Sequence, residues 1–380
     1  MITRIKSERI ILADRIIGGY VYFEDGVITA VTSNELAYDS EYDAGSSYVS
    51  PGFIDIHTHG AGGYDFTEST EAVINACNFH LMHGTTSIAP TISAAPMDAM
   101  TRAVEYVREA RRSPECKPYI IGAHMEGPYL SAEQCGAQRP DFITPPSKEE
   151  YTALVEKYGD AIARITYAPE NDKDGEFARF MTSHGIVVSA GHTNAIGDEM
   201  KVAADNGCKL ITHLYSCTST VTRDKGFRRL GVIESAYLDD DMYVEIIADG
   251  RHLPPDLIKL ILKIKGTDRV ALITDSLAPA GTDAKTCKGI SGEYIILDGV
   301  ARLPDLSAFA GSIATADRLI RVMTGEADVP LCDAVKMLTE IPARIMGLNK
   351  GKLAVGYDAD IIVFDEGINI GAAFVGGKKV

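Results

Sequence analysis

The sequence lacks paired cysteines, long apolar runs and an excess of basic residues. Its seven cysteines are scattered and none forms a C-x-x-C motif, so a structural zinc site made of cysteine thiolates is not expected. Isolated cysteines fit reduced thiols in a cytoplasmic protein. Charged residues interrupt every apolar stretch of residues 1–19, and neither a signal peptide nor a membrane span fits this segment.

Acidic residues outnumber basic ones, 53 to 37, and the formal net charge is −16. An acidic surface disfavours nucleic acid and anionic membranes as partners, because both are negatively charged themselves. The chain has 380 residues, of which 46% are hydrophobic, enough for one large catalytic domain and a smaller one. An anionic substrate would need local positive charge against this background.

Eight apolar, β-branched segments predict strands, and the segments between them predict helices. Near-continuous apolar strands that alternate with helices are typical of a parallel sheet covered by helices. Eight such units predict an α/β protein with a (β/α)8 barrel, and a doubly wound sheet is the alternative. One predicted helix opens with Ser147 and Glu150, the signature of a capping box. The predicted strands cover residues 53–59, 85–92, 119–126, 163–170, 185–193, 209–215, 243–250 and 269–275.

The two ends of the chain have a different texture. Residues 1–50 and 349–380 contain short strand patterns separated by turn residues. Two β-rich ends that flank a long α/β segment predict one small β-sandwich domain built from both termini. The predicted barrel then covers residues 51–348.

Candidate metal ligands fall at the carboxyl ends of the predicted strands. His57 and His59 alternate along the first strand, so both imidazoles leave the same face. Five of the nine histidines lie at strand ends, and in a barrel these ends meet at one face. Chance scatter is therefore a poor explanation. The candidates are His57, His59, His124, Glu126, His192, His213 and Asp275.

Histidine and carboxylate ligands suit Zn²⁺ or Fe²⁺. A catalytic ion keeps one position open for water and lowers the pKa of that water toward about 7. A nearby carboxylate such as Asp275 could take up the water proton and return it to a leaving amine. These residue types therefore point to a hydrolase that acts on an amide or related bond.

Each candidate also has a structural interpretation. Glu126 could form a salt bridge at the barrel mouth, and Asp275 could cap a helix. His124 could support a ligand instead of binding the ion itself. Three other histidines lie away from strand ends and are expected to be structural or exposed: His80, His83 and His184.

The sequence contains, in order, PGFIDIHTHG, HMEGPYL, SAGHTNA, THLY, IADGRHLPP, LITDSLAPAG, AGSIATAD and GKLAVGYDADIIVFD. These motifs resemble those of the amidohydrolase superfamily, and most closely those of the N-acetylglucosamine-6-phosphate deacetylases. HMEGPYL, with its glutamate on the third strand, resembles the deacetylase branch specifically. Relatives such as dihydroorotases use a carboxylated lysine on the fourth strand, whereas the corresponding ARITYAPE has no lysine.

The resemblance implies Glu126, His192 and His213 as the principal metal ligands and Asp275 as the general base and acid. His57 and His59 match family members that hold a second ion, so one or two Zn or Fe ions per subunit are expected. The implied reaction removes the acetyl group from N-acetylglucosamine 6-phosphate or a close amino-sugar 6-phosphate.

The resemblance also implies substrate contacts. His252 matches a histidine that contacts substrate, and Gln138 lies where many members have histidine and some have glutamine. After THLY, the usual Asn-Ala-Met is replaced by a segment that begins with Ser216 and Cys217, whose backbone N–H groups could still hold an anion. Arg228 best matches an arginine that members often donate across a dimer interface, so a homodimer is expected.

Two other functions stay open. The divergent loop at residues 216–229 leaves room for a related amidohydrolase with another N-acyl or a cyclic amide substrate. A non-catalytic scaffold of the same fold would be expected to lose candidate ligands, whereas every one of them is present here.

Overall fold

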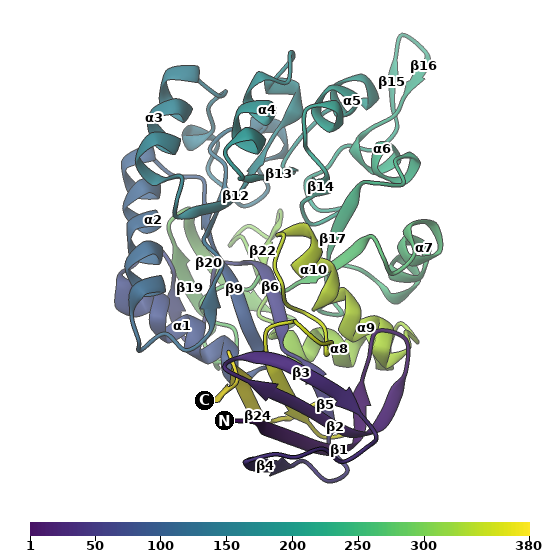
Figure 1. The fold of residues 1–380 in the computed structure, drawn as a ribbon. Helices are drawn as coiled ribbons and strands as arrows, with labels where there is room; N and C mark the ends of the chain where they lie inside the picture. Colours follow the sequence, from purple (N-terminus) through teal and green to yellow (C-terminus); the bar gives the residue numbers. More distant parts are fainter.

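The computed structural model describes residues 1–380 and shows a ring of parallel strands surrounded by helices (Figure 1). The ring closes where the Asp275 backbone N–H donates to the His57 carbonyl at 2.9 Å and the His59 N–H donates to the Ser276 carbonyl at 2.8 Å. The predicted (β/α)8 barrel is thus confirmed, and the doubly wound alternative is excluded because its sheet would stay open. The strands are β6 (Phe53–Thr58), β9 (Thr85–Ser93), β11 (Ala123–Glu126), β12 (Ile162–Tyr167), β13 (Val187–Ala190), β14 (Leu210–Ile211), β17 (Tyr243–Ile247) and β18 (Val270–Ile273).

The third barrel strand is interrupted, which the apolar pattern did not indicate. A short strand, β10 (Tyr119–Ile120), pairs with β9 and is separated from β11 by a kink at Gly122. Gly122 has a φ of +148°, and a Cβ there would lie 2.8 Å from the Ala163 Cβ. Only glycine fits this close approach to the neighbouring strand.

Helices cover the outside of the barrel and bury their apolar faces against it. Ser147 precedes α3, as predicted, but the capping box is wrong. The Ser147 hydroxyl donates to the Glu149 carboxylate at 3.1 Å, and the Glu150 carboxylate instead accepts a hydrogen bond from the Tyr129 hydroxyl at 2.8 Å. The helices are α1 (Thr70–Met82), α2 (Met97–Arg112), α3 (Lys148–Tyr158), α4 (Glu176–Ser183), α5 (Gly197–Asp205), α6 (Val232–Leu238), α7 (Pro255–Lys265), α8 (Ala316–Gly325), α9 (Leu331–Met337) and α10 (Glu340–Ile345).

Strands from both ends of the chain share one sheet below the barrel (Figure 1). Strand β5 pairs in antiparallel register with β23, which joins the N-terminal and C-terminal halves of that sheet. This sheet has its own apolar core, which includes Ile5, Val21 and Phe374. Its strands are β1 (Thr3–Ile11), β2 (Ile16–Glu24), β3 (Val27–Thr32), β4 (Ser40–Asp43), β5 (Tyr48–Pro51), β23 (Ile361–Phe364), β24 (Ile370–Val375) and β25 (Lys378–Lys379).

Three β-elements inserted after barrel strands were not predicted. The first is a hairpin of β7 (Gly60–Ala61) and β8 (Tyr64–Asp65), directly after β6. A four-stranded antiparallel sheet follows β18 and consists of β19 (Thr286–Gly289), β20 (Gly292–Leu297), β21 (Val300–Arg302) and β22 (Phe309–Gly311). A hairpin of β15 (Thr222–Asp224) and β16 (Phe227–Arg229) follows β14 and projects from the rim of the barrel (Figure 1). None of the helices combines the length and the hydropathy that a membrane crossing requires.

Candidate active site

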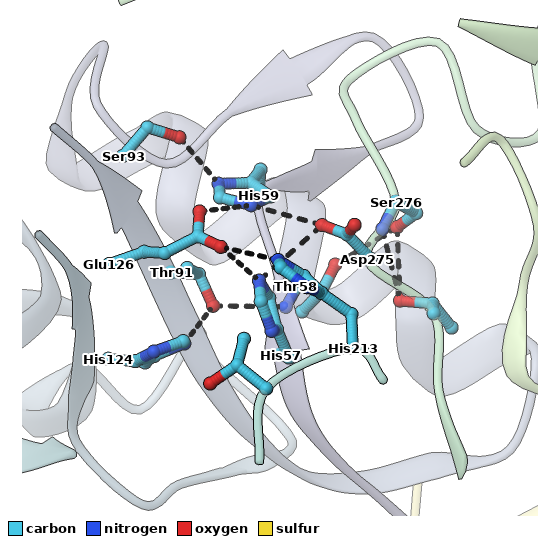
Figure 2. Close-up of polar contacts among 12 residues, drawn as sticks. His57, Thr58, His59, Thr91, Ser93, His124, Glu126, His213, Asp275 and Ser276 are labelled. Carbon is cyan, nitrogen blue, oxygen red and sulfur yellow. Dashed lines mark hydrogen bonds and ion pairs between the residues drawn. The ribbon is translucent and has the colours of Figure 1, made fainter. Parts of the chain in front are cut away.

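The Glu126 carboxylate lies at the centre of the histidines at the barrel mouth. Its Oε1 is 3.0 Å from the His213 Nε2, 3.2 Å from the His192 Nε2 and 3.4 Å from the His57 Nε2, and its Oε2 is 3.5 Å from the His59 Nε2. Figure 2 shows this carboxylate pointing toward the imidazoles of β6. Four strand ends therefore direct nitrogen and oxygen ligands into one small volume.

Asp275 faces the same volume from the opposite side. Its Oδ1 is 3.2 Å from the His59 Nε2 and 3.4 Å from the His57 Nε2 (Figure 2). His57 and His59 lie on one face of β6, as the alternation predicts, whereas the hydroxyl of the intervening Thr58 lies 3.1 Å from the His80 Nε2. Asp275 is thus part of the cluster and is not a helix cap.

The imidazoles are oriented through their other nitrogen. The Nδ1 of His192 lies 2.8 Å from the Gln134 carbonyl and that of His213 lies 3.1 Å from the Ser216 carbonyl. A carbonyl only accepts hydrogen bonds, so both Nδ1 atoms carry a proton, and Nε2 is the nitrogen of each ring that is left to bind an ion. The His59 Nδ1 lies 3.1 Å from the Ser93 hydroxyl (Figure 2).

Three of these residues have left-handed backbone conformations. The φ angles are +47° at His192, +29° at His213 and +46° at Asp275. Non-glycine residues rarely adopt such angles and do so at a cost, which is typical of sites where the surrounding structure fixes a side chain for function. Each of the three lies two residues beyond the last residue of its strand, where the chain turns and directs the side chain into the mouth.

These residues fit a divalent transition metal. Two groups of three residues each hold their ligand atoms within 4.8 Å of one another. One group is His57, His59 and Asp275, and the other is His57, Glu126 and His213. The His57 side chain is fully buried and its Nε2 has no hydrogen-bond partner. A buried nitrogen without a partner is costly, and a cation between Glu126 and Asp275 would remove that cost.

The electrostatics are those of a cation site. Burial alone would lower the pKa of His57, but Glu126 and Asp275 outweigh burial and raise it to about 10. Burial would raise the pKa of both carboxyls, yet the neighbouring imidazoles hold the pKa of Glu126 well below its ordinary value and also lower that of Asp275. Burial lowers the pKa of His213. Both carboxylates therefore stay ionised and attract positive charge.

A cavity of about 260 Å³ opens onto the cluster. Four of the sequence-predicted substrate contacts line it: Gln138, Ser216, Cys217 and His252. The Gln138 Nε2 lies 3.3 Å from the His192 Nε2, and the His252 Nδ1 lies 2.8 Å from the Asp249 carboxylate. The Ser216 N–H already donates to the His213 carbonyl at 2.9 Å, whereas the Cys217 N–H has no partner within the chain.

Arg228 is not brought to this cavity. It is exposed on β16 and borders a different cavity of about 550 Å³, between α5 and α6. No lysine or arginine lines the cavity at the cluster. Within one chain, the cavity therefore has histidines and backbone N–H groups but no permanent cation.

Sequence reasoning missed two residues of the cavity wall. The inserted sheet supplies Tyr294 and Phe309 to the cavity wall, and Phe309 packs against His252 with ring centroids 5.0 Å apart. His124 is held between the hydroxyls of Thr91 and Thr166, at 3.1 and 2.7 Å, and its ring packs against His57. His124 thus supports a neighbour, which is the structural interpretation of that residue.

The family model of the amidohydrolase family matches residues 48–380. The chain belongs to the amidohydrolase family. Among its curated relatives is the N-acetylglucosamine-6-phosphate deacetylase of Bacillus subtilis, 31% identical over 94% of this chain and 92% of the relative. Another is the N-acetylgalactosamine-6-phosphate deacetylase of a Shewanella species, 29% identical over 91% of this chain and 89% of the relative.

A solved structure extends the similarity to three dimensions. The N-acetyl-D-glucosamine-6-phosphate deacetylase of Mycobacterium smegmatis, determined as a mutant in complex with N-acetyl-D-glucosamine-6-phosphate, is 27% identical. The two structures superpose over 100% of this chain and 99% of the Mycobacterium smegmatis chain, with a TM-score of 0.91. This amidohydrolase therefore lies in the deacetylase branch, as the HMEGPYL motif indicates.

Proposed function

We propose that this amidohydrolase removes the acetyl group from N-acetylglucosamine 6-phosphate, or a close N-acetyl amino-sugar 6-phosphate, and releases acetate and the free amine. The observation that carries the proposal is the convergence of four imidazoles and two carboxylates on one buried volume beside an open cavity. The relatives that match over nearly the whole chain support this substrate class.

The principal ion would be held by Glu126, His192 and His213, and a second by His57 and His59. Zn²⁺ and Fe²⁺ suit this mixture of imidazole and carboxylate ligands. The two oxygens of the Glu126 carboxylate face different imidazoles, Oε1 that of His213 at 3.0 Å and Oε2 that of His59 at 3.5 Å, which supports two ions side by side. Anomalous scattering from crystals grown with excess metal would test this, and a single ion at full loading would exclude the second position.

When bound, such an ion would polarise the amide carbonyl and lower the pKa of a water molecule, so that a hydroxide nucleophile would be available near neutral pH. The carboxylate of Asp275 borders the cavity and is ionised, so it can accept a proton from the attacking water. The same oxygen can return that proton to the leaving nitrogen. Gln138 and His252, on the cavity wall, would orient the acetyl group and the sugar.

The phosphate requires donors that one chain does not supply. Because no lysine or arginine lines the cavity, we propose that Arg228 of the partner subunit reaches the cavity in a homodimer and binds the phosphate. The unpartnered N–H of Cys217, on the cavity wall of the same chain, would be a second donor to the phosphate. The projecting hairpin that carries this arginine supports such an exchange.

The decisive experiment is acetate release from a panel of N-acetylated sugars, each with and without the 6-phosphate. Both the glucosamine and the galactosamine epimers belong in the panel, because relatives of both kinds match this chain. We expect the phosphorylated sugars to be turned over much faster. Equal turnover with and without phosphate would favour the alternative, a related amidohydrolase for another N-acyl or cyclic amide substrate.

A further inference from the structure

Arg164 and Glu245 form a buried ion pair inside the barrel, beneath the ligand cluster. Arg164 on β12 and Glu245 on β17 have fully buried side chains, and the two terminal guanidinium nitrogens, Nη1 and Nη2, donate to the Glu245 carboxylate. Such a pair is costly to desolvate, and apolar residues of similar volume are often as stable. Packing alone therefore gives no reason for charges at this depth.

All five N–H donors of Arg164 have partners, and these fix its position. Besides the two bonds to Glu245, its Nε donates to the Ser189 hydroxyl at 3.1 Å, Nη2 to the Thr212 hydroxyl at 2.8 Å and Nη1 to the Ile56 carbonyl at 3.2 Å. These partners come from β13, the end of β14 and β6. The guanidinium thus connects the β6 backbone, one residue before His57, to the far side of the barrel.

Glu245 makes direct contact with two of the candidate ligands. Its Oε2 lies 3.5 Å from the His57 Nδ1 and accepts the His213 backbone N–H at 3.4 Å. His57 is the only one of the four clustered imidazoles whose Nδ1 faces a carboxylate, and it is the one residue common to both groups of ligand atoms. A carboxylate at Nδ1 holds a proton on that nitrogen, so Nε2 is the nitrogen that gives up its proton when a metal ion binds.

We infer that Arg164 and Glu245 form a positioning unit that fixes the ring orientation and tautomer of His57 for metal binding; this inference rests on the proposed function. Arg164 holds the carboxylate, the carboxylate holds Nδ1–H, and Nε2 then points between Glu126 and Asp275 (Figure 2). Neither residue touches the cavity, so their effect is on metal affinity and not on substrate contact.

Glu245→Gln tests this with little change in shape. The amide cannot satisfy Arg164 with two oxygens and also accept from His57, so one contact must be lost. We expect Zn²⁺ affinity, measured by competition with a chromogenic chelator, to weaken roughly 10- to 100-fold. The visible spectrum of the Co²⁺-loaded protein should change as well, because it reports ligand geometry.

Two further variants separate positioning from stability. Arg164→Met/Glu245→Leu replaces the whole pair with apolar groups and leaves no unpaired buried charge, so it should fold and still show weakened Zn²⁺ binding. Asp360→Asn is the matched control: it disrupts the buried Lys350–Asp360 pair, 2.8 Å apart, near the amino end of β6. It should lower Tm and leave Zn²⁺ affinity unchanged.

The outcomes are distinguishable. If the wild type binds neither Zn²⁺ nor Fe²⁺ stoichiometrically, the proposed function itself falls. If the wild type binds Zn²⁺ but Glu245→Gln and the double variant bind it equally well, only the positioning role is overturned, and the buried pair is structural.

Discussion

At the barrel mouth each candidate ligand is buried and contacts several neighbours, whereas the β15–β16 hairpin is exposed along its whole length. The His57 ring, for example, packs edge-on against His124, while the Arg228 side chain bonds only to the Gly226 carbonyl at 3.3 Å. Side chains that are held from several directions lose little entropy when they bind an ion or substrate. An exposed hairpin is free to adapt to another surface.

The difference separates two tasks. The residues proposed to perform the chemistry come from the strand ends of one chain, where closure of the barrel fixes their spacing. The permanent cation that an anionic substrate needs is absent from that chain's cavity and present on the projecting hairpin. The following predictions test whether reaction and recognition are divided in this way.

Removal of the ions should have the largest effect. Dialysis against a chelator is expected to abolish acetate release, and Zn²⁺ or Fe²⁺ should restore it. His192→Asn should sharply reduce the metal content, because the Nε2 of His192 lies in contact with Glu126 and His213. Elemental analysis measures this, and full occupancy in the variant would mean that the ligand set is wrong.

Asp275→Asn should retain the ions and the fold but lose most of the reaction rate. Asparagine cannot accept the water proton or donate one to the leaving nitrogen, so kcat is expected to fall roughly 10²- to 10⁴-fold. Metal content and Tm serve as controls. A decrease of only a few fold would show that another group is the general base.

Arg228→Ala should have a smaller and selective effect. Charge-assisted hydrogen bonds from arginine to phosphate should be worth about tenfold or more in kcat/KM, with little change for the unphosphorylated sugar. Arg229→Ala is the matched control, because adjacent side chains of a strand point to opposite faces. Dilution of the wild type to monomers should reproduce the Arg228→Ala phenotype, and full activity of the monomer would reject exchange across an interface.

Phe227→Ser should have the smallest effect on the folded chain. Phe227 is 75% exposed at the hairpin turn, so its replacement should change the free energy of unfolding by less than about 0.5 kcal/mol. Sedimentation of the same variant should show weaker self-association if the hairpin lies in an interface. A large loss of stability in the monomer would instead indicate that the hairpin packs against the barrel.

The strand ends were predictable because two simple periodicities combine there. Alternation along β6 placed His57 and His59 together, and the barrel rule brought Glu126, His213 and Asp275 to the same face. The sheet shared by both termini followed from the similar texture of the two ends. These features depend on local pattern and topology, which a single sequence carries.

Other features depend on contacts between distant segments. Arg164 and Glu245 lie on different strands and look out of place in apolar runs until the barrel closes around them. The wall formed by Tyr294 and Phe309 comes from an insertion that belongs to no barrel unit. The position of Arg228 is set by the length of the loop after β14, for which periodicity has no signal.

The pairing of β5 with β23 has a consequence for how the chain folds. Only Gly52 separates β5 from β6, the strand that opens the barrel, and the partner strand of β5 is synthesised more than 300 residues later. Until then the edge of β5 has unpaired N–H and C=O groups that other chains can pair with. Contacts over such sequence separations also form slowly. A chain that ends before Ile361 therefore exposes an unpaired strand edge next to its first barrel strand. The nascent protein depends on its last strands for protection against aggregation.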